Sequence, residues 1–434
     1  MSVDFYKEFG ELGYLANYSN HGFYEDGVFY KTVEHYYQAK KYDNPTIIKK
    51  ILDADTPKEA SIIGRDRSNI RIPNFKNIKD DVMFQGIYLK FMAHPDIRAK
   101  LIETGNRMIR EMTINEFYWG VGYDLSGENH IGKILCDVRE KIKSDMIDNL
   151  IKENQGKRVY VIGHNNPDCD SFFSAILLSR ILRSYGVDAV SCVRDKNFID
   201  KDIVNDINKD DYQVINDFDD KKFILVDHNN LLGIPKENVI FSIDHHRITG
   251  DILNLIEIEY ASCGLLIYDL FKEKYQFNDL EKMYIIMTVL TDTDYLTSCR
   301  FSCYDKELFN EVNYCNIDIS GLKKKYFKTT DFNNNIIDNL INNSKEYNFN
   351  DKVIRRSLIT GYGNDYDMYY DKYVSSMRDA HIDLLIFCDY ENMKTYFNFN
   401  GENKTMPKFT SSTNLVLNYI NNLLEYLKTS YIKI

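Results

Sequence analysis

The chain has 434 residues, more than a single hydrophobic core ordinarily organises, so several domains are expected. Its 44% hydrophobic and 27% charged residues are typical of a soluble globular protein, and the sequence predicts neither a membrane span nor a signal peptide. Because the net charge is −11, a broad nucleic-acid-binding surface is disfavoured, and we expect a cytoplasmic protein (in the host cytoplasm if its source is a virus) with small-molecule partners.

The first predicted element that carries chemistry is a helix in the run 31–42, which contains neither glycine nor proline. Glu34, Gln38 and Lys41 are four and seven residues apart, so they share one helix face. A solvent-exposed ion-pair stripe would give the same spacing. Further along, the sole tryptophan, Trp119, precedes a glycine-rich turn, where it can stack on a planar ring. A core tryptophan beside tight turns is the alternative.

The second region alternates apolar strands with helices. A long helix from Ile131 to Ile151 ends at Gln155-Gly156 and leads into this region. The order of elements predicts a parallel α/β sheet with helices on its faces. The expected strands are 158–163, 187–193, 223–227 and 239–243, and the expected helices are 171–185, 262–273 and 280–290.

Several of these apolar elements end in side chains that bind metal ions. A buried strand does not normally end in a carboxylate or an imidazole unless that group is paired or binds metal. In parallel sheets, ligands bind beyond the carboxyl ends of the strands, so the groups can meet there. Oxygen-rich sites with some imidazole suit Mn²⁺ or Mg²⁺, and the number of groups predicts two ions and a phosphoester site. The side chains are His164, Asp168, Asp170, Asp227, His245, His246 and Asp292.

The third region is expected to be a small α+β lobe. The polar stretch 315–352 is interpreted as holding the hinge to it, and 352–360 and 382–388 are its strand candidates. An amphipathic final helix is predicted from Leu415, Leu417, Ile420, Leu423, Leu424 and Leu427.

The metal motifs resemble those of the DHH phosphoesterases, in the runs His-Asn-Asn-Pro-Asp-Cys-Asp-Ser, Val-Asp-His-Asn, Asp-His-His-Arg and Thr-Asp-Thr. The chain is most similar to the manganese-dependent family II inorganic pyrophosphatases, with a DHH domain at 157–312 and a DHHA2-like lobe at 318–434. A homodimer through the DHH domain is also expected. The resemblance implies that His164 and Asp168 hold one Mn²⁺ (or Mg²⁺) and that Asp170, His245 and Asp292 hold the other, with Asp227 bridging and His246 contacting the substrate phosphate.

The C-terminal lobe departs from the pyrophosphatase pattern. The basic cluster with which those enzymes hold the second phosphate is not recognisable, and Asn403-Lys404-Thr-Met-Pro-Lys408 occupies the expected region. Arg355-Arg356 is the other basic pair of the lobe, and Cys169 replaces a Thr-like residue in the first motif. Pyrophosphate, a short polyphosphate and a small phosphodiester therefore stay open as substrates.

Residues 1–150 are similar to the NADAR (YbiA-like) family. The similarity lies in Phe9-Gly…Tyr-Leu-Ala-Asn-Tyr, in Val-Glu-His-Tyr-Tyr-Gln-Ala-Lys-Lys and in Trp-Gly-Val-Gly…Gly-x-Asn-x-x-Gly-Lys. It implies a mainly α domain without a metal cofactor and with N-glycosidase activity. The implied substrates are phosphorylated ribosyl-amine intermediates of riboflavin biosynthesis, or ADP-ribose compounds.

Cleavage of an N-glycosidic bond requires proton transfer and stabilisation of a cationic sugar carbon. Glu34 suits that work, and Lys41 can form a Schiff base with the sugar if burial lowers its pKa. Arg65 is expected at the phosphate and Trp119 against the base. Ala16 and Glu116 stand where the family usually has Ser and Asp. The complete expected substrate-binding set is Asn17, Gln38, Arg65, Trp119, Gly120 and Asn129.

These interpretations together predict a bifunctional hydrolase that acts on small phosphorylated metabolites. One alternative is that one module is a degenerate nucleotide-binding sensor and only the other is catalytic. A nucleic-acid exonuclease of the DHH group is disfavoured by the negative charge.

Overall fold

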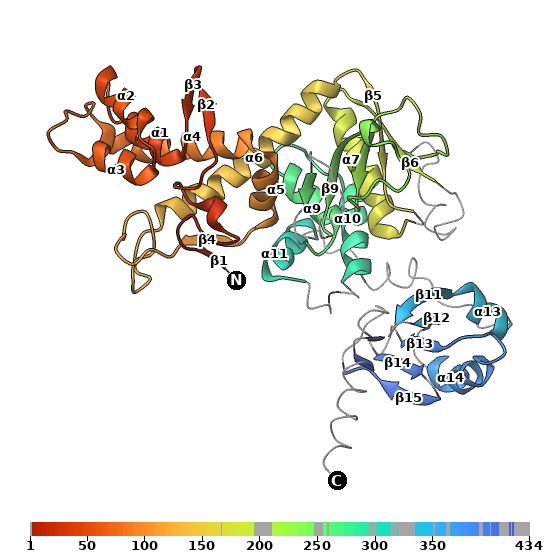
Figure 1. Cartoon of the computed structure of the whole chain (residues 1–434). Coiled ribbons are helices and arrows are strands. Elements are labelled where there is room, and N and C mark those ends of the chain that lie inside the picture. The colour runs from red at the N-terminus through yellow and green to blue at the C-terminus, as the bar shows by residue number, and fades with distance from the viewer. Residues whose placement is uncertain are drawn as a thin grey trace, which may run out of the picture.

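The computed structural model contains three successive regions, coloured from red to blue in Figure 1. No helix in the described part of the chain is both long and apolar enough to cross a bilayer. The residues described are 2–165, 167–194, 211–246, 255–257, 260–293, 296, 301–313, 319, 335–349, 352–361, 365–389, 394–399, 401–407, 416–417 and 419–420.

The N-terminal region is mainly helical, as expected, and has two small sheets. In one sheet two strands pair in parallel although about a hundred residues separate them, and the other is a hairpin. The strands are β1 (Ser2–Phe5), β2 (Phe23–Glu25), β3 (Val28–Tyr30) and β4 (Met108–Glu111), and the helices are α1 (Val33–Ala39), α2 (Pro45–Asp53), α3 (Pro57–Arg65), α4 (Phe75–Ala93), α5 (Pro95–Glu103) and α6 (His130–Asn154).

Helix α1 lies at the centre of this region, against α2, α3 and α4. It begins after Thr32, whose hydroxyl accepts a hydrogen bond from the His35 backbone N–H and caps the helix. All seven of its residues are buried, which is unusual for a helix that contains a glutamate and a glutamine. Polar side chains on a helix that is buried on every side need polar partners or a cavity, so a functional site is expected at α1.

The middle region is built on a six-stranded parallel sheet in the order β10-β9-β8-β5-β6-β7. Helices α7, α9 and α10 pack against one another on this sheet. The predicted strands and helices are present, and β7, β10 and α11 were not predicted. The elements are β5 (Arg158–Ile162), β6 (Asp188–Val193), β7 (Gln213–Val214), β8 (Phe223–Val226), β9 (Val239–Asp244), β10 (Leu255–Glu257), α7 (Cys169–Ser184), α9 (Cys263–Phe271), α10 (Asp279–Asp292) and α11 (Cys303–Val312).

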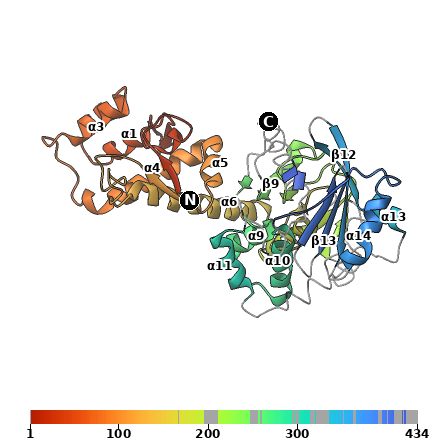
Figure 2. The same ribbon diagram turned by 90° about the horizontal axis from the view of Figure 1, so that it is seen from below.

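Helix α6 leads from the N-terminal region into the middle region (Figure 2). Polar contacts join the two regions: the Asn106 amide donates to the Tyr260 hydroxyl at 2.9 Å, and Lys274 pairs with Asp148 of α6 at 2.7 Å. Helix α5 packs against β10, and one continuous apolar core includes residues of both regions. The two regions are therefore packed against each other and are not joined by a linker alone.

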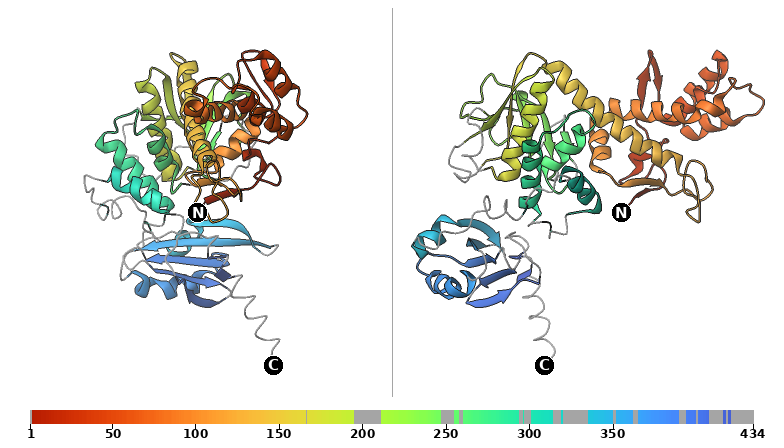
Figure 3. Two further views of the ribbon diagram at one scale, coloured as in Figure 1. Left: turned by 90° about the vertical axis from the view of Figure 1, so that its left-hand side faces the viewer. Right: turned by 180° about the vertical axis from the view of Figure 1, so that it is seen from behind.

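The C-terminal lobe lies beside the middle region, on the side away from the N-terminal region (Figure 3). Its sheet runs β11 to β15 in order, antiparallel except for the parallel pair β12–β13, and helices α13 and α14 complete its core. The two predicted strands are present as β12 and β13. The elements are α13 (Ile336–Asn342), β11 (Ser344–Phe349), β12 (Lys352–Gly361), α14 (Asp365–Ser376), β13 (Leu384–Asp389), β14 (Lys394–Phe399) and β15 (Glu402–Thr405).

Two expectations for this lobe lie largely outside the described residues. Leu417 and Ile420 of the predicted final helix are helical and buried. The other four leucines of that helix and most of the expected hinge, 315–352, are not among the described residues.

Candidate functional sites

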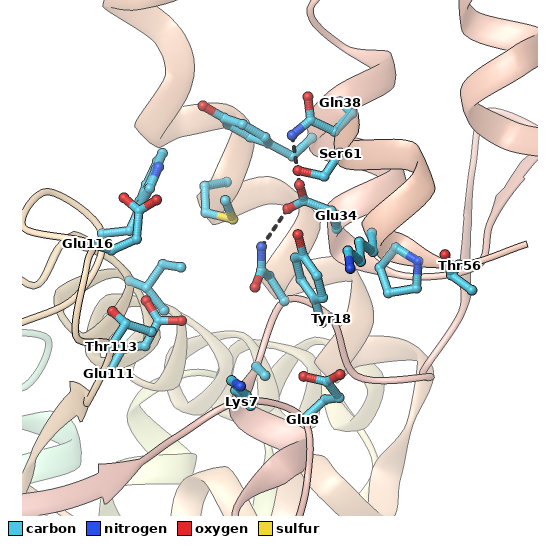
Figure 4. A pocket seen from close by; sticks show the side chains of 18 of the residues that line it. Lys7, Glu8, Tyr18, Glu34, Gln38, Thr56, Ser61, Glu111, Thr113 and Glu116 are labelled. Atoms are coloured by element: carbon cyan, nitrogen blue, oxygen red, sulfur yellow. Dashed lines mark hydrogen bonds between the residues drawn. The ribbon is translucent and has the colours of Figure 1, made fainter. Parts of the chain in front are cut away.

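A pocket of about 810 Å³ opens in the N-terminal region (Figure 4). Its wall combines the loop before α1, α1 itself, the start and end of α3, and the segment that follows β4. Six of its lining residues were predicted from the sequence: Asn17, Glu34, Gln38, Lys41, Arg65 and Trp119.

Glu34 is held by two amides. The Asn17 Nδ2 donates to one carboxylate oxygen at 2.7 Å, and the Gln38 Nε2 donates to the other at 2.7 Å. Gln38 reaches this position because Gly64 of α3 has no side chain, and a Cβ there would overlap the Gln38 amide. Burial raises the pKa of Glu34, while hydrogen bonds from Gln38 and Ser61 oppose that rise. Glu34 is only 3% exposed, so the alternative of a solvated ion-pair stripe is wrong.

Lys41 lies two residues beyond the end of α1 and points back to the same cluster. Its Nζ donates to the Gln38 Oε1 at 2.6 Å and lies 4.8 Å from the centre of the Tyr37 ring. Burial lowers the pKa of Lys41 to about 8, although the Glu34 charge acts in the opposite direction. A lysine with this pKa has a sizeable fraction of neutral amine near neutral pH.

The remaining expected binding residues divide into two groups. Trp119 is half-buried in the pocket wall and meets the Tyr37 ring edge-on at 5.6 Å, and Arg65 is exposed at the end of α3. Gly120 and Asn129 do not line the pocket. Asn129 instead bonds the backbone of β4, with its Nδ2 donating to the Ile109 carbonyl at 2.8 Å and its Oδ1 accepting from the Glu111 N–H at 3.0 Å. Its contacts support the pocket wall from behind.

Sequence reasoning missed several lining residues. Glu111 is the most notable, because it is only 8% exposed and burial, followed by the charges of Glu116 and Glu34, raises its pKa to about 7. Its strand of four residues is too short to give a pattern, so the only available signal was an acid at the end of an apolar segment. Other lining residues that were not predicted as part of the site are Tyr18, Ser61, Met83, Thr113 and Glu116. Glu116 had been noted only because it stands where the family usually has Asp.

The second candidate site lies at the carboxyl ends of β5, β8 and β9, where its ligands were expected. Among the described residues, the side chains form overlapping groups whose ligand atoms lie within 4.8 Å of one another. One group is His164, Asp168 and Asp227, and another is Asp170, His245 and Asp292. Asp227 contacts both histidines, at 3.3 Å from the His164 Nε2 and 3.1 Å from the His245 Nε2, which is the arrangement of a bridging carboxylate.

Neighbouring groups orient these side chains. The His245 Nδ1 contacts the Tyr260 carbonyl at 3.0 Å, and because a carbonyl only accepts, Nδ1 carries a proton and Nε2 is the nitrogen available to a metal ion. Asp170 accepts from the Cys263 and Gly264 N–H groups at the start of α9, at 2.7 and 3.0 Å. His246 is half exposed and held by Asp244 at 2.9 Å, a position open to a substrate.

The chemistry of this donor set fits divalent cations. The buried Asp227 carboxylate lies 3.1 Å from the His245 Nε2, and Asp170 and Asp292 lie 3.5 and 3.4 Å from the same nitrogen, so several ligand atoms converge on one point. Asp227 also has a left-handed backbone, with φ of +61°, which an aspartate adopts only where surrounding structure holds it. Burial, then the neighbouring Asp227 charge, raises the pKa of Asp170 to about 7, and a cation would relieve that repulsion.

Three of the four basic residues singled out in the C-terminal lobe have partners of their own. Lys404 lies 3.7 Å from Glu402 on β15, and Arg356 donates to the Tyr347 hydroxyl at 2.7 Å. Arg355 donates to the Ser344 hydroxyl at 2.9 Å. Lys408 lies outside the described residues.

Fold and sites together define a two-domain hydrolase with a separate C-terminal lobe, and comparison with known proteins agrees. Residues 4–143 match the NADAR domain, and residues 158–293 match the N-terminal domain of the DHH family. An N-glycosidase of Nostoc punctiforme is 36% identical over 147 residues, which are 33% of this chain and 94% of that protein. The chain therefore belongs to the NADAR family, and we call residues 158–293, which match the N-terminal domain of the DHH family, its DHH domain.

Two further proteins are similar to parts of the chain. A chloroplastic riboflavin biosynthesis protein of Zea mays, PYRR, is 33% identical over 155 residues, which are 32% of this chain and 25% of that protein. The solved structure of an exopolyphosphatase-related protein from Bacteroides fragilis covers 66% of this chain and 96% of its own, with a TM-score of 0.41 and 16% identity.

Proposed function

We propose that the chain is a bifunctional hydrolase. Its NADAR domain cleaves the N-glycosidic bond of phosphorylated ribosyl-amine intermediates of riboflavin biosynthesis, or of related ADP-ribose compounds. The observation that carries this proposal is the buried cluster of Glu34, Gln38 and Lys41 in a pocket that also holds Trp119. The Nostoc N-glycosidase and the maize riboflavin protein support the reaction and the substrate class.

Each residue of the cluster has a chemical task in this proposal. Glu34, fixed by two amide donors, stabilises positive charge on the sugar carbon as the bond to nitrogen breaks. Lys41 supplies a neutral amine that takes the sugar carbon as a Schiff base. Trp119 stacks on the leaving base, and Arg65 binds the phosphate.

The first prediction tests this activity in the full-length protein. With EDTA present, the wild type should release the base from a 5′-phosphoribosyl-amine, because none of the clusters of metal-ligating side chains found among the described residues lies in this pocket. Glu34→Gln should lower the rate by about 10²–10⁴-fold by removing the stabilising charge. Chromatography of the released base measures both. Full activity of Glu34→Gln on every cleaved substrate contradicts the assignment, and ligand binding without turnover indicates the sensor alternative.

For the DHH domain we propose a phosphohydrolase that uses two Mn²⁺ (or Mg²⁺) and acts on pyrophosphate, a short polyphosphate or a phosphodiester. His164 and Asp168 would hold one ion, Asp170, His245 and Asp292 the other, and Asp227 both. Two bound ions supply an activated water and a counter-charge for the leaving oxygen. His246, half exposed and held by Asp244, contacts the substrate phosphate.

The second prediction is that Asp227→Asn abolishes Mn²⁺ binding and phosphate release but leaves N-glycosidase activity intact. An amide cannot supply the two charged oxygens that face both histidines. Titration calorimetry reports binding independently of activity. The matched control is Asp219→Asn, an exposed aspartate of the same domain. Near-normal Mn²⁺ stoichiometry in Asp227→Asn means that the two-ion assignment is wrong.

A further inference from the structure

Glu111 is a buried acid in the N-terminal pocket to which no role has yet been given. It is the last residue of β4 and opposes Phe5 of β1 in the sheet register. Its backbone is fixed on both sides, because its N–H donates to Asn129 and its carbonyl accepts from Val121 at 2.9 Å. The direction in which its side chain leaves the backbone is therefore set by the fold.

Within the described part of the chain, the carboxyl group of Glu111 has no hydrogen-bond or ion-pair partner. The residue is 92% buried. An unpaired buried carboxyl costs stability, and a leucine or methionine at this position would not. In Figure 4, Glu111 and Glu116 lie on one side of the pocket and Glu34 and Gln38 on the other.

The two buried acids have different surroundings. Glu34 receives hydrogen bonds on both oxygens and lies near Lys41, and all of these favour its charged form although burial opposes it. Glu111 experiences burial and the negative charges of Glu116 and Glu34, and all three raise its pKa, to about 7. Burial raises the pKa of both acids, but only Glu34 has hydrogen-bond donors and a cation that oppose the rise, so of these two carboxyls on facing walls Glu111 is the one suited to carry a proton.

We propose that Glu111 is a catalytic residue that donates a proton to the leaving nitrogen, from the pocket wall opposite Glu34. The proposal rests on the N-glycosidase function proposed above. The bond between the sugar carbon and nitrogen breaks, its electron pair stays on nitrogen, and the Glu111 proton joins that pair. The sugar carbon forms a new bond to the oxygen of water, directly or after a covalent stage on Lys41, and a proton of that water returns to the Glu111 carboxylate.

The experiment compares two substrates in the full-length protein with EDTA. One is a 5′-phosphoribosyl-amine, whose leaving nitrogen needs a proton. The other is 4-nitrophenyl riboside 5-phosphate, whose nitrophenolate leaves without one. Glu111→Gln should lower kcat/KM about 10²–10³-fold on the first and less than about tenfold on the second. Glu34→Gln should lower both alike, because both pass through a cationic sugar carbon. The matched control is Glu103→Gln, because Glu103 is an exposed acid at the end of α5 and lies outside the pocket.

The pH profile gives a second measurement on the amine substrate alone. In the wild type, kcat should fall above pH about 7 as Glu111 loses its proton, and Glu111→Gln should lack this fall. Equal losses on both substrates, or a fall that persists in Glu111→Gln, indicate a structural role and overturn the proposal. If the wild type cleaves neither compound, the N-glycosidase function itself fails. If it cleaves them and Glu111→Gln is unimpaired, only the role of Glu111 fails.

Discussion

Lys41 illustrates how burial changes the chemistry of a single side chain. It is 6% exposed, and its ammonium group meets an amide oxygen and the Tyr37 and Phe75 rings instead of a carboxylate in direct contact. Desolvation without a directly bound counter-ion disfavours the charged form, which is why its pKa falls to about 8 from the usual 10.5. Roughly a tenth of a group with this pKa is neutral amine at pH 7, and half of it at pH 8.

The third prediction concerns this amine. If Lys41 attacks the sugar carbon, the covalent adduct formed from 4-nitrophenyl riboside 5-phosphate, whose leaving group needs no proton from Glu111, should form faster as the pH rises and level off above pH about 8, because only the neutral amine is a nucleophile. Borohydride should trap the sugar on the wild-type protein, as measured by mass spectrometry. Lys41→Arg keeps a positive charge and should show no adduct. Turnover without any trapped sugar at pH 8 favours direct attack by water.

At the scale of elements, long apolar segments were predictable and short ones were not. Strands β5, β8 and β9 are mainly apolar and mostly buried, and the candidate metal ligands His164, Asp227 and His245 follow them closely, so one pattern located both the sheet and the site. Strands β7 and β10 have two and three residues, which is too few for a period. Strand β4 pairs with β1, which lies about a hundred residues earlier in the sequence, and no local signal indicates that pairing.

The same difference explains which site residues were missed. Glu34, Gln38 and Lys41 are neighbours along one helical segment, so their spacing predicts their contact. Glu111 reaches them only through tertiary structure, because β4 is placed by β1 and by the Asn129 amide. Gly120 and Asn129 belong to a recognisable motif, but the motif includes residues that build the wall as well as residues that face the substrate.

The fourth prediction belongs to strand β15 and the lobe around it. Pyrophosphate should be cleaved with a lower kcat/KM than tripolyphosphate, because the lobe has no recognisable basic cluster for a second phosphate, and the exposed Lys404 lies only 3.7 Å from the Glu402 carboxylate, which would repel one. Each charge-assisted contact that is absent is worth about 1.5–3 kcal/mol. Phosphate release from both substrates in one assay measures the ratio. Lys404→Met should leave both values nearly unchanged. Pyrophosphate as the best substrate of the panel would show that the lobe supplies these charges in another way.

At the scale of the whole molecule, the NADAR and DHH domains share one apolar core. The Asn106 amide donates to the Tyr260 hydroxyl, and the Tyr260 backbone carbonyl in turn orients the candidate metal ligand His245. Helix α5 packs on β10, and Lys274 pairs with Asp148 of α6. We therefore expect the two domains to unfold together.

The fifth prediction tests that cooperativity with the sole tryptophan, which lies in the NADAR pocket. Adding Mn²⁺ at about a hundred times its Kd stabilises the DHH domain by about 2.7 kcal/mol. The thermal transition reported by Trp119 fluorescence should then rise by about 2–4 °C, although the ion binds in the other domain. Asp227→Asn should abolish the shift. A Trp119 transition that ignores Mn²⁺ in the wild type shows that the domains unfold separately.

Helix α6 has a practical consequence for anyone who wants one activity without the other. Ile142, Met146, Ile147, Leu150 and Ile151 are all buried along its second half. Cutting the chain just after α6 keeps this apolar face but removes the domain that helps to cover it, and cutting inside the helix removes part of the shared core. Truncated proteins of either kind should aggregate when expressed. Point variants of the full chain that abolish one activity at a time should remain soluble.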